Sequence, residues 1–174
     1  MEQDERRARL ESLFAAHAPA VQAYARRRAD PATADDVVSD VFVVAWRRLD
    51  QVPADELPWL LACARHVLAD ARRSEGRRLA LVQRLTTNAP RVEGAPELND
   101  GALGEALASL SGRDREVLLL LAWDGLSAEQ AAEVLGCSQR TFSMRLHRAR
   151  KRLAAALAIS NRSEVQPTME PCND

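Results

Sequence analysis

Basic side chains are concentrated in one short stretch near the C-terminal end of the chain. Residues 138–152 contain five arginines and one lysine without an acidic residue, although the whole chain has a formal net charge of -1. Charge of one sign gathered on a single helix suits contact with nucleic-acid phosphates. It equally suits a solvated helix whose cations lie near its C-terminus, where they interact favourably with the helix dipole. Charge alone therefore leaves both interpretations open.

Apolar spacing shows how this stretch would be oriented. Phe142, Leu146, Ala149 and Leu153 follow one another at i, i+4, i+7 and i+11, which predicts a helix with one buried face. The remaining faces then carry the side chains that could contact DNA, namely Arg140, Thr141, Ser143, Met144, Arg145, His147, Arg148 and Lys151.

The residues just before this helix predict a second, shorter one. Ser127 is followed three residues later by Gln130, which is a capping-box spacing, and Ser138 precedes Thr141 in the same way. Gly136 suits the left-handed residue that ends a helix. Two capped helices joined by a tight turn, the second strongly basic, predict a helix-turn-helix that binds DNA.

Composition limits the fold and the compartment. The 174 residues are 47% hydrophobic but only 4% aromatic, which favours helices and allows one or two small domains. The sequence contains no long apolar run, and its charged N-terminus does not resemble a signal peptide. We therefore expect an all-α cytoplasmic protein without membrane insertion.

Residues for metal or enzyme chemistry are sparse. The three cysteines have no CxxC spacing, so we expect no disulfide, no zinc site and no cofactor. Cys63 and His66 could share a helix face as two metal ligands, but a half-buried thiol is the simpler interpretation. GxSxG, Walker A and HExxH motifs are absent, so we expect no enzyme and no catalytic residue.

Helical periodicity divides the chain into two small domains. The first, residues 5–85, should hold helices over 5–28, from Thr33 as N-cap to about 49, and from Pro58 onward. Their predicted inward positions are Leu10, Leu13, Phe14, Val21, Tyr24, Leu60, Ala64, Val67, Leu68 and Ala71.

The C-terminal domain should follow a flexible linker. Residues 86–100 are rich in Pro, Gly and small polar residues, which is typical of a linker. Residues 101–158 should contain helices over 103–110 and 112–124, the latter capped by Ser111 with Asp114, before the helix-turn-helix. Residues 159–174 are predicted to be a disordered tail.

The C-terminal domain resembles a known family. Residues 110–153, above all the run RLHRARKRL, resemble region 4 of extracytoplasmic-function (ECF) sigma factors. The resemblance implies that residues 138–152 recognise a promoter minus-35 element. Apart from the basic ending, the same arrangement also resembles the DNA-binding domain of LuxR-type response regulators, so region 4 alone leaves that alternative open.

The N-terminal domain resembles region 2 of the same sigma factors. Residues 34–50, ADDVVSDVFVVAWRRLD, are similar to region 2.2, which implies docking on the clamp helices of the largest polymerase subunit. The implied contacts are Asp35, Asp36, Ser39, Asp40 and Phe42, with Ser39 standing where the family commonly has Gln. Without the resemblance, acids near a helix N-terminus would be explained by the helix dipole.

Residues 58–78 are similar to regions 2.3 and 2.4, which melt and read the minus-10 element. Five arginines against two acids give this segment a charge of +3, as contact with a strand backbone requires. Trp59 could stack on a base, although a lone tryptophan is more often part of the core. The implied minus-10 contacts are Trp59, Arg65, His66, Arg72 and Arg73, and His66 stands where the family often has Asn.

The resemblance implies a sigma factor with several partners. These are core RNA polymerase, contacted at the clamp helices and the flap region, promoter DNA, and a restraining anti-sigma factor. A LuxR-type regulator that binds duplex DNA as a dimer is the alternative. A third hypothesis is an interaction module such as an anti-sigma factor or adaptor, but the chain lacks an HxxxCxxC segment.

Overall fold

The computed structural model describes residues 3–85 and 101–164, and within these ranges every regular element is a helix. This confirms the predicted all-α fold with two small domains. The predicted linker at 86–100 and the last ten residues of the predicted tail lie outside the described residues.

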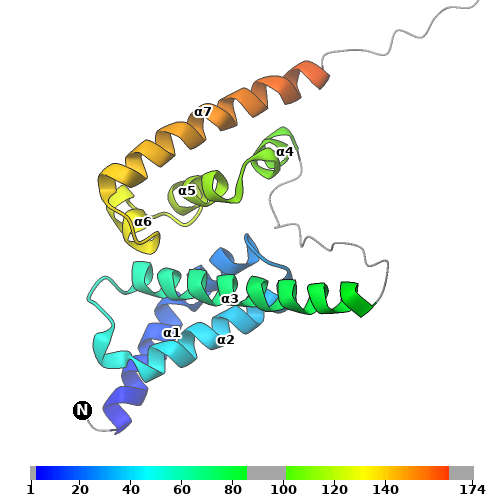
Figure 1. The fold of residues 1–174 in the computed structure, drawn as a ribbon. Coiled ribbons are helices and arrows are strands. Elements are labelled where there is room, and N and C mark those ends of the chain that lie inside the picture. Colours follow the sequence, from blue (N-terminus) through cyan, green and yellow to red (C-terminus); the bar gives the residue numbers. More distant parts are fainter. Residues whose placement is uncertain (1–2, 86–100, 165–174) are drawn as a thin grey trace, which may run out of the picture.

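Three helices form the N-terminal domain. They are α1 (Gln3–Arg26), α2 (Pro31–Arg47) and α3 (Glu56–Leu85), with a short 3-10 helix at Leu49–Gln51 between the last two. Figure 1 shows α1 and α2 side by side beneath the first half of α3, whose second half extends away from the other two. Val21, Tyr24 and Leu60 are fully buried between these helices, as the apolar spacing predicts.

The start of α2 differs from the prediction. Asp30, not Thr33, is the N-cap, and its Oδ1 accepts a hydrogen bond of 3.1 Å from the backbone N–H of Thr33. The hydrogen bonds from the Thr33 hydroxyl and amide hold the pKa of the Asp30 carboxyl below its usual range. The prediction was wrong because Pro31, whose fixed φ suits the first helical position, already begins the helix.

Phe14 also differs from its predicted inward position. Its side chain is 49% exposed, and its ring makes an edge-type contact with Phe42, with 4.8 Å between the ring centroids. Leu10 is half-buried, so the inward face of α1 is carried mainly by Leu13, Val21 and Tyr24.

Four helices form the C-terminal domain: α4 (Ala102–Ser109), α5 (Gly112–Ala122), α6 (Ala128–Val134) and α7 (Gln139–Glu164). The predicted caps are confirmed, because Ser127 and Gln130 form a capping box and the Ser111 hydroxyl accepts from the amide of Asp114. Gly136 has φ 60°, the left-handed conformation that ends α6 at low steric cost.

The last helix is longer than predicted. α7 continues to Glu164, so the prediction of disorder beginning at residue 159 was wrong for 159–164. The helix continues because residues 153–158 just before this segment are rich in Ala and Leu, and residues 159–164 contain neither Gly nor Pro.

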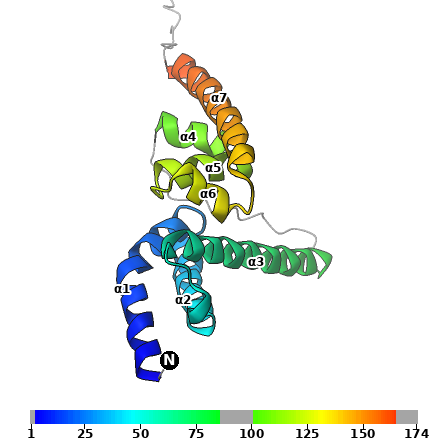
Figure 2. The same cartoon turned by 90° about the vertical axis from the view of Figure 1, so that its left-hand side faces the viewer.

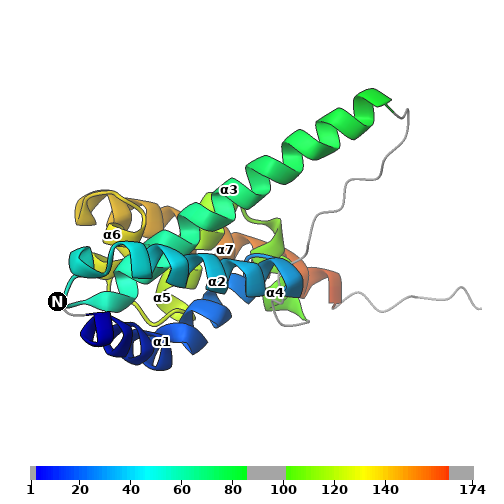
Figure 3. The same cartoon turned by 90° about the horizontal axis from the view of Figure 1, so that it is seen from below.

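The two domains pack directly against each other. Figures 1 and 2 show α6 lying on α3, and α7 on the far side of the C-terminal domain from α3. One continuous apolar cluster joins both domains, with Leu60 and Ala64 on one side and Ala131 and Val134 on the other. Viewed from below, α3 crosses beneath the C-terminal domain (Figure 3). This contact was not predicted from the sequence.

Candidate nucleic-acid interface

The helix-turn-helix presents one apolar face inward and a polar face to solvent. Phe142 and Ala149 of α7 are fully buried, and the hydroxyl of Ser138 caps the helix by accepting from the Thr141 amide at 3.2 Å. Of the eight predicted DNA contacts, Thr141 alone is half-buried, and its hydroxyl lies 2.8 Å from the Ser138 hydroxyl. The exposed ones are Arg140, Ser143, Met144, Arg145, His147, Arg148 and Lys151.

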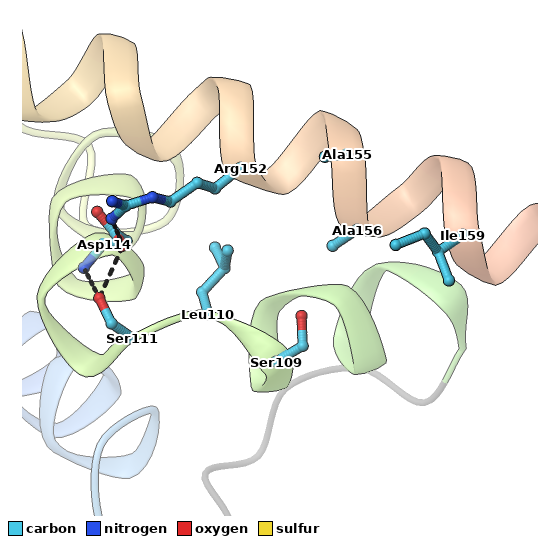
Figure 4. Close-up of a pocket in the computed structure, with 8 residues that line it drawn as sticks. All are labelled: Ser109, Leu110, Ser111, Asp114, Arg152, Ala155, Ala156 and Ile159. Atoms are coloured by element: carbon cyan, nitrogen blue, oxygen red, sulfur yellow. Dashed lines mark hydrogen bonds and ion pairs between the residues drawn. The ribbon is translucent and has the colours of Figure 1, made fainter.

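One arginine of the basic stretch is used inside the domain. Nη1 of Arg152 donates to Oδ2 of Asp114 at 2.5 Å, and the Ser111 hydroxyl donates to the same oxygen at 2.7 Å (Figure 4). The hydrogen bond from Ser111 and, to a smaller extent, the contacts with Arg152 hold the pKa of the Asp114 carboxyl below its usual range. Arg152 therefore ties α7 to the start of α5, and sequence reasoning, which counted it among the phosphate-binding charges, missed this pair.

A shallow groove continues beyond this ion pair, where α7 passes α4. Figure 4 shows the side chains that line it, which come from the end of α4, the start of α5 and the C-terminal half of α7. The lining residues are Ser109, Leu110, Ser111, Asp114, Arg152, Ala155, Ala156 and Ile159. The groove is separate from the exposed basic face of α7.

The acidic residues of α2 differ in their surroundings. Asp35 accepts a 2.5 Å hydrogen bond from Gln22 and lies 3.9 Å from a guanidinium nitrogen of Arg26. Asp36 and Asp40 are exposed, and neither carboxylate has a hydrogen-bond partner among the described residues. Their spacing of four residues places both on one face of the helix, where they remain available to a partner.

Phe42 does not share that availability. It is 7% exposed and packs in the core, where it supports the exposed surface of α2 from beneath. The predicted direct contact of Phe42 with core polymerase does not fit this burial. The exposed apolar side chains nearby are Phe14, Val43 and Trp46. Sequence reasoning missed Val43 as a surface residue, although its i+7 spacing from Asp36 and i+3 spacing from Asp40 could have indicated it.

The predicted minus-10 residues lie between the first turn and the middle of α3. Trp59 is half-buried and packs against the core, which fits the packing role better than base stacking. Arg65 is half-buried, whereas His66, Arg72 and Arg73 are exposed. Arg73 is ion-paired with Asp70, while Nη2 of Arg72 donates to the backbone carbonyl of Arg28 at 2.7 Å.

Neither a metal cluster nor a membrane helix occurs in residues 3–85 and 101–164. No three His, Cys, Asp or Glu side chains of these residues lie close enough to hold an ion together. Cys63 is half-buried, and burial raises the pKa of its thiol. None of the helices in the same ranges combines the length and the apolar character that spanning a membrane requires.

The chain matches two family models, one in each domain. Residues 13–78 match sigma-70 region 2, and residues 100–153 match sigma-70 region 4. The chain is 32% identical to the RNA polymerase sigma factor NccH of Alcaligenes xylosoxydans over 72% of this chain and 74% of that one. It is 30% identical to the ECF RNA polymerase sigma factor SigL of Mycobacterium tuberculosis, over 85% of this chain and 88% of SigL.

Solved structures show the same architecture. The sigma factor RpoE from Bartonella quintana, solved with the anti-sigma factor NepR, superposes with a TM-score of 0.66 at 26% identity, over 86% and 96% of the two chains. CnrH, solved with the cytosolic domain of CnrY, gives a TM-score of 0.60 at 30% identity over 86% and 88%. Fold and site thus define a two-domain transcription initiation protein. The chain belongs to the ECF family of RNA polymerase sigma factors.

Proposed function

We propose that the two domains divide promoter recognition between them. The exposed face of α7 contacts the minus-35 element through Arg140, Ser143, Met144, Arg145, His147, Arg148 and Lys151, and the half-buried Thr141 orders the first turn. The exposed face of α3, with His66, Arg72 and Arg73 and the half-buried Arg65, contacts the opened minus-10 element. The single observation that carries the proposal is the exposed face of α7, which carries several arginines and a lysine and no acidic residue over residues 139–151.

The contact with core polymerase is proposed for an exposed side of α2. Asp36 and Asp40 are exposed acids without a partner in the described structure, and Val43 and Trp46 extend the same side with apolar area. A cationic and partly apolar pair of helices, such as the clamp helices of the largest subunit, suits this surface. Region 4 would contact the flap region.

An anti-sigma factor is the proposed restraint. RpoE was solved with the anti-sigma factor NepR, and CnrH, which is 30% identical to this chain, was solved with the cytosolic domain of CnrY. We expect a cognate partner of the same kind here. The protein is proposed to act in the cytoplasm, where polymerase and promoter DNA are found, and to contribute binding energy rather than catalysis.

Run-off transcription with purified core polymerase on a library of GC-rich promoters tests the proposal. We expect transcripts only when both the chain and core polymerase are present, from promoters that share one minus-35 and one minus-10 motif. Arg145→Ala/Arg148→Ala should lower transcription from all of them. Promoter-independent transcription, or none with a protein that binds core, would contradict the assignment.

The LuxR-type alternative is not favoured. The matched region 2 model covers the N-terminal domain, which an unrelated input domain would not explain.

A further inference from the structure

A largely buried group of charged and polar side chains lies where the two domains meet. We call it the domain-junction cluster, and it consists of Tyr24, Arg27 and Arg28 from the N-terminal domain and Glu116 and Asp124 from the C-terminal domain. Arg28 donates from Nε to Glu116 and from Nη2 to Asp124, each at 2.7 Å. Arg27 is ion-paired with the other oxygen of Asp124, and the Tyr24 hydroxyl donates to Glu116 at 2.9 Å.

Burial makes this cluster unusual. The side chains of Arg28 and Asp124 are 4% and 1% exposed, and the Arg28 guanidinium lies 3.6 Å from the centroid of the Tyr24 ring. Burial raises the pKa of Tyr24 well above its usual range, so the phenol stays protonated and donates. Every carboxylate that contacts Arg27 or Arg28 within the described residues comes from the other domain.

The charged part of the interface lowers the cost of separating the domains, whereas the apolar cluster that also joins them raises it. The three ion pairs of the cluster gain little over apolar packing of the same shape, because desolvation offsets much of their attraction. Once the domains part, however, water solvates all four charged groups, whereas apolar groups would remain exposed. Separation therefore leaves Arg27 and Arg28 as two adjacent cations without a carboxylate partner.

These two arginines lie beside the proposed minus-10 surface. Arg72, one of the predicted minus-10 residues, donates to the backbone carbonyl of Arg28 at 2.7 Å. The guanidinium group presents the same fork of N–H donors to a carboxylate and to a phosphate. A nucleic-acid backbone that follows the exposed face of α3 as far as Arg72 would therefore reach Arg27 and Arg28.

The proposed function requires the two domains to separate, and the inference about Arg27 and Arg28 rests on the proposed function in this respect. Elements named for positions -10 and -35 are about 25 base pairs apart, or roughly 85 Å along B-DNA. The long helix α3, with 30 residues, spans only about 45 Å. Two small domains in direct contact cannot reach both elements at once.

We propose that Arg27 and Arg28 are a phosphate-binding pair for the promoter backbone, and that Glu116 and Asp124 cover this pair in the free protein. The C-terminal domain then acts as an intramolecular competitor of DNA for the N-terminal domain.

Neutral variants of the full chain test this with a labelled single-stranded DNA oligonucleotide. Glu116→Gln/Asp124→Asn removes the covering charges at nearly constant shape. Glu129→Gln/Glu133→Gln removes two charges from exposed residues of α6 and is the matched control for net charge. The quadruple variant, with Arg27→Gln/Arg28→Gln added to the first pair, removes the proposed site without leaving a buried charge unpaired.

We expect the first variant to bind the oligonucleotide more tightly than the control, with a log–log salt dependence steeper by about 1.4, the value for two single-strand phosphate contacts. The quadruple variant should return to the slope of the control. An unchanged slope in the first variant, or a steep slope that persists in the quadruple variant, would overturn the inference. Far-UV circular dichroism checks folding, and Asp124→Asn alone serves if the double variant does not fold.

Transcription assays on the same preparations separate this inference from the proposed function. If the wild-type chain supports run-off transcription but all variants share one salt-dependence slope, the proposed function stands and the covered phosphate site is refuted. If the Glu116→Gln/Asp124→Asn variant shows the steeper salt dependence but no variant supports transcription, the covered phosphate site stands and the promoter assignment is refuted.

Discussion

At the scale of single residues, exposure and existing partners separate the acids of α2. Asp35 is already engaged by Gln22 and Arg26, whereas Asp36 and Asp40 have no partner in the described part of the chain. Because Asp36 and Asp40 give up no existing protein contact when a cation approaches, they should carry more of the polymerase contact than Asp35.

Changing Asp36 and Asp40 to Ala should therefore weaken core polymerase binding more than tenfold. The same change should alter the free energy of unfolding by only about 0.5 kcal/mol per residue, because both carboxylates are exposed and lie beyond the first turn of α2. A titration of labelled chain with core polymerase measures the first quantity, and urea unfolding the second. Glu129→Ala/Glu133→Ala serves as the control, and equal affinity of the two variants would refute the assignment.

On the recognition helix, we expect base reading and phosphate contact to separate. Ser143 and His147 are exposed on α7, although the Ser143 hydroxyl already donates to the Gln139 carbonyl at 2.9 Å. Replacing either should change the preferred promoter sequence, since a good base contact contributes about 1 to 3 kcal/mol of discrimination. Arg145→Ala should instead weaken binding to all promoters alike, and it should lower the log–log salt dependence of binding by about one phosphate contact. A promoter library read by sequencing decides, and an unchanged sequence profile for Ser143 and His147 variants would contradict the prediction.

At the scale of elements, local patterns predicted the helices and most of their ends. The caps at Ser111, Ser127 and Ser138 depend on residues three positions apart, so the sequence alone determines them. The first turn of α2 was misassigned to Thr33, because Pro31 already begins the helix and makes the preceding Asp30 the N-cap.

Long-range packing explains what sequence reasoning missed. Arg28 and its carboxylate partners are separated by 88 and 96 positions, and no local period connects them. The exposure of Phe14 and the burial of Phe42 depend likewise on how α1 lies against α2. Candidate DNA contacts on α7 were predictable because one helix carries both the apolar stripe and the polar faces.

The Asp114 carboxylate joins α5 to α7 and makes the C-terminal domain sensitive to acid. Its pKa in the folded chain lies below the ordinary value, so protonation favours the unfolded state. The stabilisation is complete above the unfolded pKa of about 4 and disappears as the pH falls through the lower folded pKa. Thermal unfolding from pH 7 to pH 2 should show this loss in the wild type. Asp114→Asn should be less stable at pH 7, and its stability should change less with pH below pH 4. Parallel profiles for the two proteins would exclude this role for Asp114.

At the scale of the whole molecule, the relative position of the domains sets how DNA is recognised. The free chain holds both domains in contact through an apolar cluster and the domain-junction cluster, so the two proposed DNA-binding faces cannot lie on both promoter elements together. Core polymerase, by binding each domain at its own place, would fix the spacing that the promoter needs.

We therefore expect the free chain to bind promoter duplex weakly and the holoenzyme to bind it tightly. Once both domains are docked on one rigid body, the second DNA contact becomes intramolecular, which can raise avidity by roughly 10² to 10⁴. A mobility-shift titration of one promoter duplex, with and without core polymerase, measures the difference, and a duplex with scrambled minus-10 and minus-35 elements is the control. A LuxR-type dimer predicts the opposite, a footprint by the free chain that is symmetric about a dyad. Tight and symmetric binding that core polymerase leaves unchanged would refute the division of promoter recognition proposed for the two domains.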